Sequence, residues 1–215
     1  MSYLKDPTAI YRQSFQAIRR EVDLSCFPEA LHPMVLRLVH AAAQPDIVSD
    51  LAWEGDPAAA TRGALTGGAP VLVDAKMVAV GIMAGRLPSG SQVRCRLDDP
   101  KVAGLARELG TTRSAAAVEL WRPDLAGAVI AIGNAPTALF HLLEMLADGD
   151  CPRPAVLLAF PVGFVGAAES KEALIAAKTG IPYITLRGRR GGSAYAAAAV
   201  NALLIPAAEA EGGRS

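Results

Sequence analysis

The sequence predicts a three-layer α/β domain with a mostly parallel sheet and a helical N-terminal segment. Two helical patterns open the chain, and short hydrophobic runs then alternate with further helical patterns. Four of the five runs are unbroken, which is typical of parallel strands covered on both faces. With 215 residues, 52% of them hydrophobic, the chain is long enough for one well-buried core. We therefore expect residues 1–215 to form a single domain.

The N-terminal segment is expected to contain two helices. Apolar residues recur at helical spacing through residues 8–21 and again through residues 30–43, after the break at Pro28. In the second helix the apolar stripe contains Leu31, Val35 and Leu38.

Five strands are expected after these helices. Four are unbroken apolar runs, and one alternates polar with apolar residues and is therefore expected at an edge or in a hairpin. The unbroken runs are residues 71–73, 128–132, 155–159 and 183–186, and the alternating one is residues 92–95.

Glycines and polar residues follow the predicted strands at their carboxyl ends. They are Asp74 and residues 133–137, 161–166 and 187–193, which we call the strand-end rim. Ligands of α/β proteins bind outside the carboxyl ends of the strands. Glycine lets the backbone approach a ligand closely, and helix N-termini offer free N–H groups to anions. The rim therefore predicts a site for carboxylates or phosphates.

Composition excludes several classes of partner. Lys plus Arg and Asp plus Glu number 21 each, so no overall charge steers the protein to nucleic acid or to an anionic membrane. The three cysteines form no CxxC pair, which argues against a disulfide framework and favours the cytoplasm. We see no signal peptide at the start. The most apolar window, residues 125–147, is broken at residues 133–136, so it is not expected to span a membrane.

Common cofactor and metal motifs are absent from the sequence. There is no Gly-Lys-Ser/Thr loop, no GxGxxG after the first strand and no GxSxG elbow. No trio of metal ligands emerges either. We therefore expect no cofactor and no metal.

Of the three histidines, His40 has the strongest claim to chemistry. It falls on the side of its helix opposite the apolar stripe, yet Leu36 shares that side, so something is expected to cover it. A subunit interface or a ligand would do so, and a plain surface role fits the residues equally well. For His32 and His141 a structural role is the better interpretation.

Several charged residues have two interpretations. Arg113 stands at a predicted helix start, where its charge does not complement the helix dipole, so it is either solvated or bound to a carboxylate. Capping explains Glu169 and Ser170 without any function. The arginines within residues 187–190 fit either an anion site or an ordinary basic loop.

Beyond these local patterns, the chain resembles the precorrin-8X methylmutase family over essentially its whole length. No single stretch would be specific, but together they are. The matching stretches are Ala9-Ile10-Tyr11-Arg12-Gln13-Ser14-Phe15 with Ile18-Arg19, Leu38-Val39-His40-Ala41, Gly68-Ala69-Pro70 to Asp74, Met77-Val78-Ala79, Thr112-Arg113-Ser114-Ala115-Ala116-Ala117, residues 131–139, residues 161–171, Arg187-Gly188 and Gly191-Gly192-Ser193.

The resemblance implies a flavodoxin-like fold, a homodimer with an active site near its interface, and an isomerase of cobalamin biosynthesis. Such an enzyme moves a methyl group from C-11 to C-12 of precorrin-8X, a tetrapyrrole, to give hydrogenobyrinate, or acts on the cobalt-bearing equivalent. The reaction needs a rigid pocket and a proton, and neither a nucleophile nor a redox cofactor. His40 matches the acid/base of the family. Substrate contacts are implied for Ser14, Arg113, Asn134, Thr137, Gly166, Glu169, Ser170, Lys171, Gly191 and Ser193.

The chain departs from the family pattern at two places. Ala42-Ala43 stand where Cys-Gly is expected after the His-Ala pair, and Lys76 stands where a carboxylate is expected. The first change is expected to loosen packing around His40 and the second to reverse a charge beside Asp74. These changes motivate an alternative, a corrinoid carrier or channelling protein of the same fold without turnover. A cruder alternative is a flavodoxin-like protein that binds a phosphate-bearing cofactor on the rim.

Overall fold

The computed structural model describes residues 3–205 and contains one mixed sheet. Its strand order is β1-β6-β5-β4-β2-β3, and every neighbouring pair is parallel except β1 with β6. The strands are β1 (Leu51–Glu54), β2 (Val71–Val73), β3 (Val93–Cys95), β4 (Val129–Ile132), β5 (Val156–Ala159) and β6 (Tyr183–Leu186).

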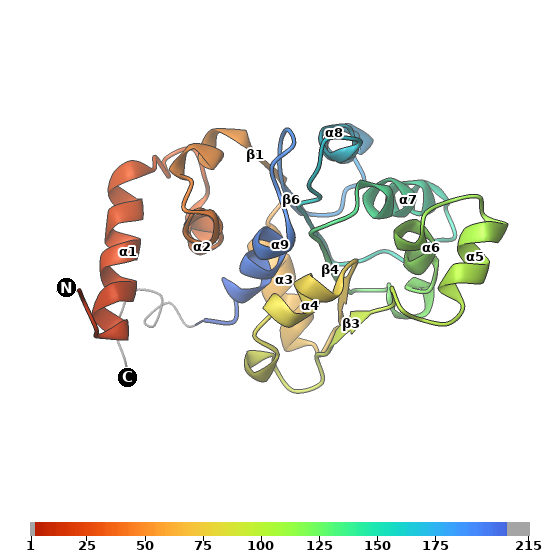
Figure 1. Cartoon of the computed structure of the whole chain (residues 1–215), viewed down its shortest axis with the longest axis horizontal. Helices are drawn as coiled ribbons and strands as arrows, with labels where there is room; N and C mark the ends of the chain where they lie inside the picture. Colours follow the sequence, from red (N-terminus) through yellow and green to blue (C-terminus); the bar gives the residue numbers. More distant parts are fainter. Residues whose placement is uncertain (1–2, 206–215) are drawn as a thin grey trace.

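The helices flank the sheet and extend beyond it at one end (Figure 1). α1 stands at that end, α2 lies between α1 and α9, and α5 lies at the opposite end of the molecule. The α-helices are α1 (Pro7–Glu21), α2 (His32–Ala42), α3 (Pro57–Thr66), α4 (Lys76–Gly81), α5 (Val102–Glu108), α6 (Arg113–Glu119), α7 (Pro136–Ala147), α8 (Ala167–Ala177) and α9 (Ser193–Asn201).

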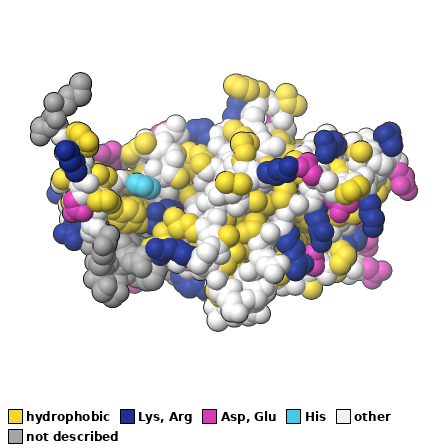
Figure 2. Space-filling view, turned by 60° about the horizontal axis from the view of Figure 1, so that its bottom comes forward, with side chains coloured by type: hydrophobic (Ala, Val, Ile, Leu, Met, Phe, Trp, Pro, Cys, Tyr) yellow, Lys and Arg dark blue, Asp and Glu magenta, His cyan; other side chains and the backbone are white. Residues whose placement is uncertain are grey.

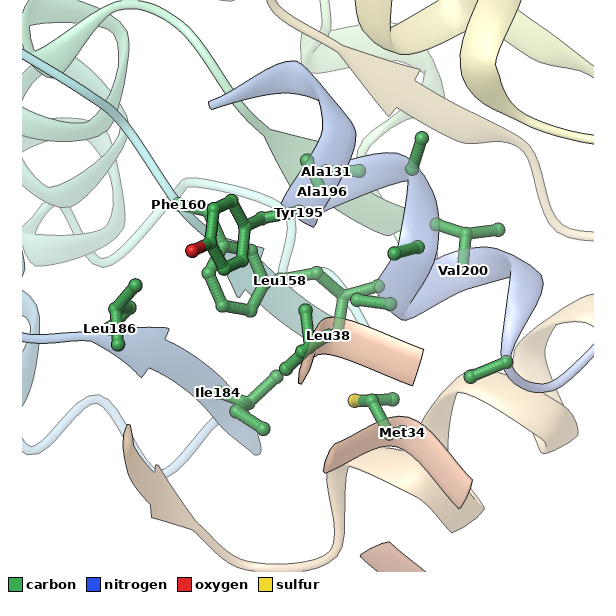
Figure 3. Packing of buried hydrophobic residues seen from close by; sticks show 14 of the residues in the cluster. Met34, Leu38, Ala131, Leu158, Phe160, Ile184, Leu186, Tyr195, Ala196 and Val200 are labelled. Atoms are coloured by element: carbon green, nitrogen blue, oxygen red, sulfur yellow. The ribbon is translucent and has the colours of Figure 1, made fainter. Parts of the chain in front are cut away.

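Each face of the sheet is buried under its own set of helices. Side chains alternate between faces along a strand, so Leu158 and Ile184 belong to one core and Leu157 and Tyr183 to the other. The first core packs α2 and α9 against the sheet, as Figure 3 shows for Met34, Leu38, Tyr195 and Val200. The second core packs α7 and α8 against the other face. This double cover explains the unbroken apolar strands.

The predicted fold class is confirmed, and the structure corrects its details. The strand β1 was missed because it is short, only partly buried and antiparallel. The alternating run is indeed an edge strand, β3, and pairs in parallel with β2. The second N-terminal helix begins with a 3₁₀ turn, Glu29–Leu31, before α2 starts at His32.

Candidate active site

His40 lies on the side of α2 that faces α1. Its Nδ1 shares a hydrogen bond of 2.9 Å with the hydroxyl of Ser14, and its ring stacks on Phe15 with centroids 4.9 Å apart. What covers the off-stripe side of α2 in this chain is therefore α1. Because Nδ1 is engaged, Nε2 is the ring nitrogen that remains for a substrate.

Arg37 lies one helical turn before His40 and on the same side of α2. It is 9% exposed, donates a hydrogen bond from Nη2 to the Tyr11 hydroxyl, and lies over the rings of Tyr11 and Phe15. Burial lowers the pKa of His40, and the charge of Arg37 lowers it further. Both effects favour the neutral form of His40 in the folded protein.

A cleft of about 270 Å³ opens beside His40. It lies between α1 and the end of α2 and is called the His40 cleft. Its lining includes Ala43, which ends α2 in the left-handed region with φ 52° and ψ 37°. Family resemblance leads us to expect glycine at this position, and alanine adopts such a conformation at a cost. The full lining is Ser14, Ala17, Ile18, Glu21, Val39, His40, Ala43 and Pro45.

A second cleft of about 410 Å³ opens between the end of α2 and the strand-end rim, and is called the Phe164 cleft. Its lining is mainly apolar, with two arginines at one side. The full lining is Ala42, Gln44, Val162, Gly163, Phe164, Arg189, Arg190, Gly191 and Tyr195. The two clefts therefore flank the residues that end α2.

Asp74 organises the rim from beneath. Its carboxylate is 2% exposed and accepts hydrogen bonds from the backbone N–H groups of Gly133, Asn134 and Ala135 at 2.7–2.9 Å. Burial raises the pKa of Asp74, and these hydrogen bonds oppose the rise. Asp74 thus fixes the turn that carries Asn134 and starts α7.

Close backbone approaches hold the rim segments together. A Cβ on Gly191 would lie 2.5 Å from the carbonyl oxygens of Phe160 and Pro161, so only glycine fits there. Gly192 N–H donates to the Phe160 carbonyl at 2.8 Å. The next residue, Ser193, begins α9, and its buried hydroxyl has no hydrogen-bond partner within residues 3–205.

The residues 169–171 lie in α8, which starts at Ala167 rather than at Glu169. The capping interpretation of Ser170 is therefore wrong, because its hydroxyl donates to the Ala167 carbonyl at 3.1 Å inside the first turn. Glu169 is an exposed acid of that turn. Lys171 is fully buried, donates from Nζ to the Arg190 carbonyl at 2.6 Å, and burial lowers its pKa to about 8.

Arg113 is the first residue of α6 and lies apart from His40. Its guanidinium donates to the Leu97 carbonyl at 3.1 Å and lies 3.6 Å from the Asp98 carboxylate. Lys76 was expected to reverse a charge beside Asp74. In the structure its side chain is exposed and forms an ion pair with Asp98. Thr137 is tied to this region, because its hydroxyl lies 2.8 Å from that of Thr112, the cap of α6.

The predicted site residues therefore form three groups within one chain. Ser14 joins His40, Arg113 lies at the start of α6, and the rim residue Thr137 is tied to the cap of α6. The rim group contains Asn134, Gly166, Glu169, Ser170, Lys171, Gly191 and Ser193. His32 and His141 have structural partners, namely the Phe27 carbonyl and the Glu119 carboxylate.

Sequence reasoning placed Asp74 on the rim but not its hydrogen bonds to the 133–135 turn, and it gave no role to three residues around His40: Tyr11, Phe15 and Arg37. A signal existed for these three. Tyr11 lies three residues before Ser14 and four before Phe15, and Arg37 precedes His40 by three residues, so each pair lies on one helix side.

Charges of both signs occur on the face of the molecule seen in Figure 2. In Figure 2, acidic and basic side chains are interspersed, with hydrophobic side chains between them. Within residues 3–205, no cluster of three or more His, Cys, Asp or Glu side chains is arranged to hold a metal ion. None of the helices in that range has the length and apolar character needed to cross a membrane.

Comparison with known proteins gives a consistent result. A family model described as precorrin-8X methylmutase matches residues 9–205. The precorrin-8X methylmutase of Pseudomonas aeruginosa is 55% identical over 94% of this chain and 97% of its own length, and that of a Sinorhizobium species is 52% identical over 95% and 97%. The cobalt-precorrin-8 methylmutase of Priestia megaterium is 36% identical over 93% and 88%.

A solved structure agrees with these sequence matches. The precorrin-8x methyl mutase of Thermus thermophilus superimposes with a TM-score of 0.80 at 36% identity, covering 91% of this chain and 96% of that one. The chain therefore belongs to the precorrin-8X methylmutase family.

Proposed function

We propose that this protein is an isomerase of cobalamin biosynthesis that moves the C-11 methyl group of precorrin-8X to C-12, giving hydrogenobyrinate, with His40 as acid/base. The family membership and the 55% and 52% identical relatives, both named precorrin-8X methylmutase, support the reaction. The observation that carries the role of His40 is its ring, oriented by Ser14 at a cleft, and the lowered pKa agrees with it.

The local geometry suits a proton-transfer role for His40. The Ser14 hydroxyl and the Phe15 ring fix the orientation of the imidazole, so Nε2 has a defined direction. The lowered pKa keeps the ring neutral, so Nδ1 and Nε2 share one proton between them. A proton moved at Nε2 to or from the macrocycle changes its bonding pattern while one carbon–carbon bond breaks at C-11 and another forms at C-12.

A rigid pocket is the second requirement of an intramolecular migration, because the methyl group must travel between neighbouring carbons in one geometry. The rim meets this requirement through fixed backbone rather than mobile side chains. Asp74 holds the Asn134 turn, and Gly191 packs against the end of β5. We propose that Asn134, Thr137, Gly166, Glu169, Ser170, Lys171, Gly191 and Ser193 shape the pocket, with Ser14 and Arg113 as further contacts.

We further propose that the substrate is the cobalt-free form. The relatives with 52–55% identity are named precorrin-8X methylmutase, whereas those named cobalt-precorrin-8 methylmutase are 30–38% identical. Parallel assays with precorrin-8X and its cobalt complex test this choice, and faster turnover of the cobalt complex would contradict it.

The decisive experiment for the function is conversion of precorrin-8X by the purified protein, followed by absorption spectroscopy. We expect the wild type to produce hydrogenobyrinate and His40→Ala to lose turnover while still binding the product. Tight product binding without conversion by the wild type, at stoichiometric enzyme, would contradict the proposal and favour a carrier.

The assembly and location are also proposals. We propose a cytoplasmic homodimer with the active site near its interface. The exposed apolar residues Ile10, Phe164 and Val165 beside the two clefts support an interface there, and the free cysteines support a reducing compartment. Sedimentation velocity tests the homodimer, and a monomer at micromolar concentration would contradict it. Cell fractionation tests the cytoplasmic location, and an exported protein would contradict it.

A further inference from the structure

The three arginines of the rim segment 187–190 are held in different ways. Both carboxylate oxygens of Glu172 lie 2.6–2.7 Å from Nη1 of Arg187. The guanidinium of Arg190 spans two carboxylates, with Nη1 2.6 Å from Asp46 and Nη2 2.6 Å from Asp50. The charges of Arg187 and Arg190 are therefore compensated within the chain.

Arg189 is exposed and has no carboxylate partner in the part of the chain that the structure describes. Its guanidinium lies 5.6 Å from the centroid of the Phe164 ring. The ring contact restrains the Arg189 side chain. It uses the flat face of the guanidinium, so the N–H groups at its edge remain free to donate hydrogen bonds. Arg189 is thus the uncompensated cation of the rim segment.

The backbone positions Arg189 and Phe164 as one wall of the Phe164 cleft. Gly163 N–H donates to the Arg189 carbonyl at 3.2 Å, which ties the two rim segments together. The lining also includes Ala42 and Gln44, at and just beyond the end of α2, the helix that carries His40. Within residues 3–205, the cleft is therefore a mainly apolar space in which Arg189 is the cation without a carboxylate partner, and it adjoins the end of the helix that carries His40.

From this arrangement we infer that Arg189 binds a carboxylate of the macrocycle, with Phe164 supporting the guanidinium and packing against the ring system. The inference rests on the proposed function. It assigns to Arg189 a preference for a macrocycle with free carboxylates over one whose carboxylates are amidated. A tetrapyrrole acid has apolar faces and an anionic periphery, and the cleft offers a surface for each. A planar guanidinium binds a carboxylate through two parallel N–H donors, which gives direction as well as attraction.

The test measures the dissociation constant of hydrogenobyrinate by absorption titration, for the wild type, Arg189→Gln and a control, Arg107→Gln. Arg107 is exposed on α5, and α5 lies at the end of the molecule away from α1 and α2 in Figure 1. We expect Arg189→Gln to weaken binding about tenfold, as for one hydrogen-bonded charge pair. Arg107→Gln is expected to leave it unchanged, and Arg189→Lys to give an intermediate value because it keeps the charge and loses the fork.

A second ligand separates a carboxylate contact from a general effect on the fold. Hydrogenobyrinate with its carboxylates converted to amides is expected to bind wild type and Arg189→Gln equally. An equal loss by Arg189→Gln for both ligands, or no loss for either, would overturn the inference. So would an altered sedimentation coefficient with unchanged product affinity, because Arg189 would then belong to a subunit contact.

The two levels of failure are distinguishable. If the wild type converts precorrin-8X and Arg189→Gln binds the product as tightly as the wild type does, only the role of Arg189 is wrong. If the wild type neither converts precorrin-8X nor binds the product, the proposed function fails, and the inference about Arg189 fails with it.

Discussion

Replacing Ala43 by glycine is expected to stabilise this protein, although the substitution removes a side-chain atom and touches no core. Ala43 ends α2 with φ 52° and ψ 37°, a left-handed conformation that Lys178 is the only other non-glycine residue to share within residues 3–205. For an L-residue this conformation costs about 1–2 kcal/mol, whereas glycine adopts it freely.

The net gain follows from two opposing terms. Glycine relieves the left-handed strain, but it also gives the unfolded chain more freedom, which costs about 0.4–1 kcal/mol of stability. The difference predicts that Ala43→Gly raises the free energy of unfolding by about 0.5–1 kcal/mol. Because Ala43 is exposed and caps the helix, no packing loss offsets this gain.

Urea denaturation of Ala43→Gly, Ala41→Gly and the wild type provides the assay. Ala41 is exposed inside the same helix, where glycine is expected to lower the free energy of unfolding by about 0.5–1 kcal/mol. The two variants should therefore shift the midpoint in opposite directions. A loss of stability for Ala43→Gly equal to that for Ala41→Gly would refute the left-handed conformation at the end of α2.

Three further substitutions test the site. Asp74→Asn is expected to lower the free energy of unfolding by about 2–3 kcal/mol in urea denaturation, because an amide accepts through one oxygen only and leaves a backbone donor of the 133–135 turn unpaired. Arg37→Gln is expected to raise the pKa of His40, moving the acid limb of the kcat/KM profile to higher pH, while burial, the larger cause of the lowered pKa, remains. Gly191→Ala is expected to cost about 1–3 kcal/mol in the same denaturation assay, because its Cβ meets two carbonyl oxygens.

Each of these expectations has a control and a contradicting result. Asp98→Asn, at an exposed ion pair, should change the free energy of unfolding little. Equal losses for Asp74→Asn and Asp98→Asn would contradict the stabilising role of the buried Asp74 carboxylate. An acid limb that stays in place or moves to lower pH in Arg37→Gln would contradict the electrostatic role of Arg37. Gly63 has open space around its Cβ position, so a loss in Gly63→Ala as large as that in Gly191→Ala would contradict the close approach.

The pH dependence of stability follows from the same shift at His40. Its folded pKa lies below the ordinary value of 6.5, so the unfolded chain binds the proton more readily. The stability contributed by neutral His40 is therefore present above pH 6.5 and is lost as the pH falls below it. Acid should weaken both the fold around α1 and the proposed chemistry.

Much of the fold was predictable because its signals are local. The buried parallel strands are unbroken apolar runs, and the glycines that follow them mark the rim. The strand β1 was not predictable, since only Leu51 of its residues is buried and its partner β6 lies about 130 residues later in the chain. Its pairing depends on the finished sheet rather than on its own pattern.

The site divides in the same way. The position of His40 off the core stripe could be derived from helical spacing, and family resemblance supplied its role. The contacts that give it chemistry are long-range: Ser14 lies 26 residues before it, and Asp74 reaches a turn about 60 residues away. Nor does the sequence show which rim arginine is free, because the carboxylates that pair with Arg190 are about 140 residues distant.

The acid/base role of His40 is tested most directly by single-turnover conversion of precorrin-8X by His40→Ala. We predict a loss of about 10²- to 10⁴-fold relative to the wild type, with product affinity retained and partial recovery when imidazole is added to fill the vacated space in the His40 cleft. Conversion by His40→Ala within threefold of the wild-type rate would contradict the central claim.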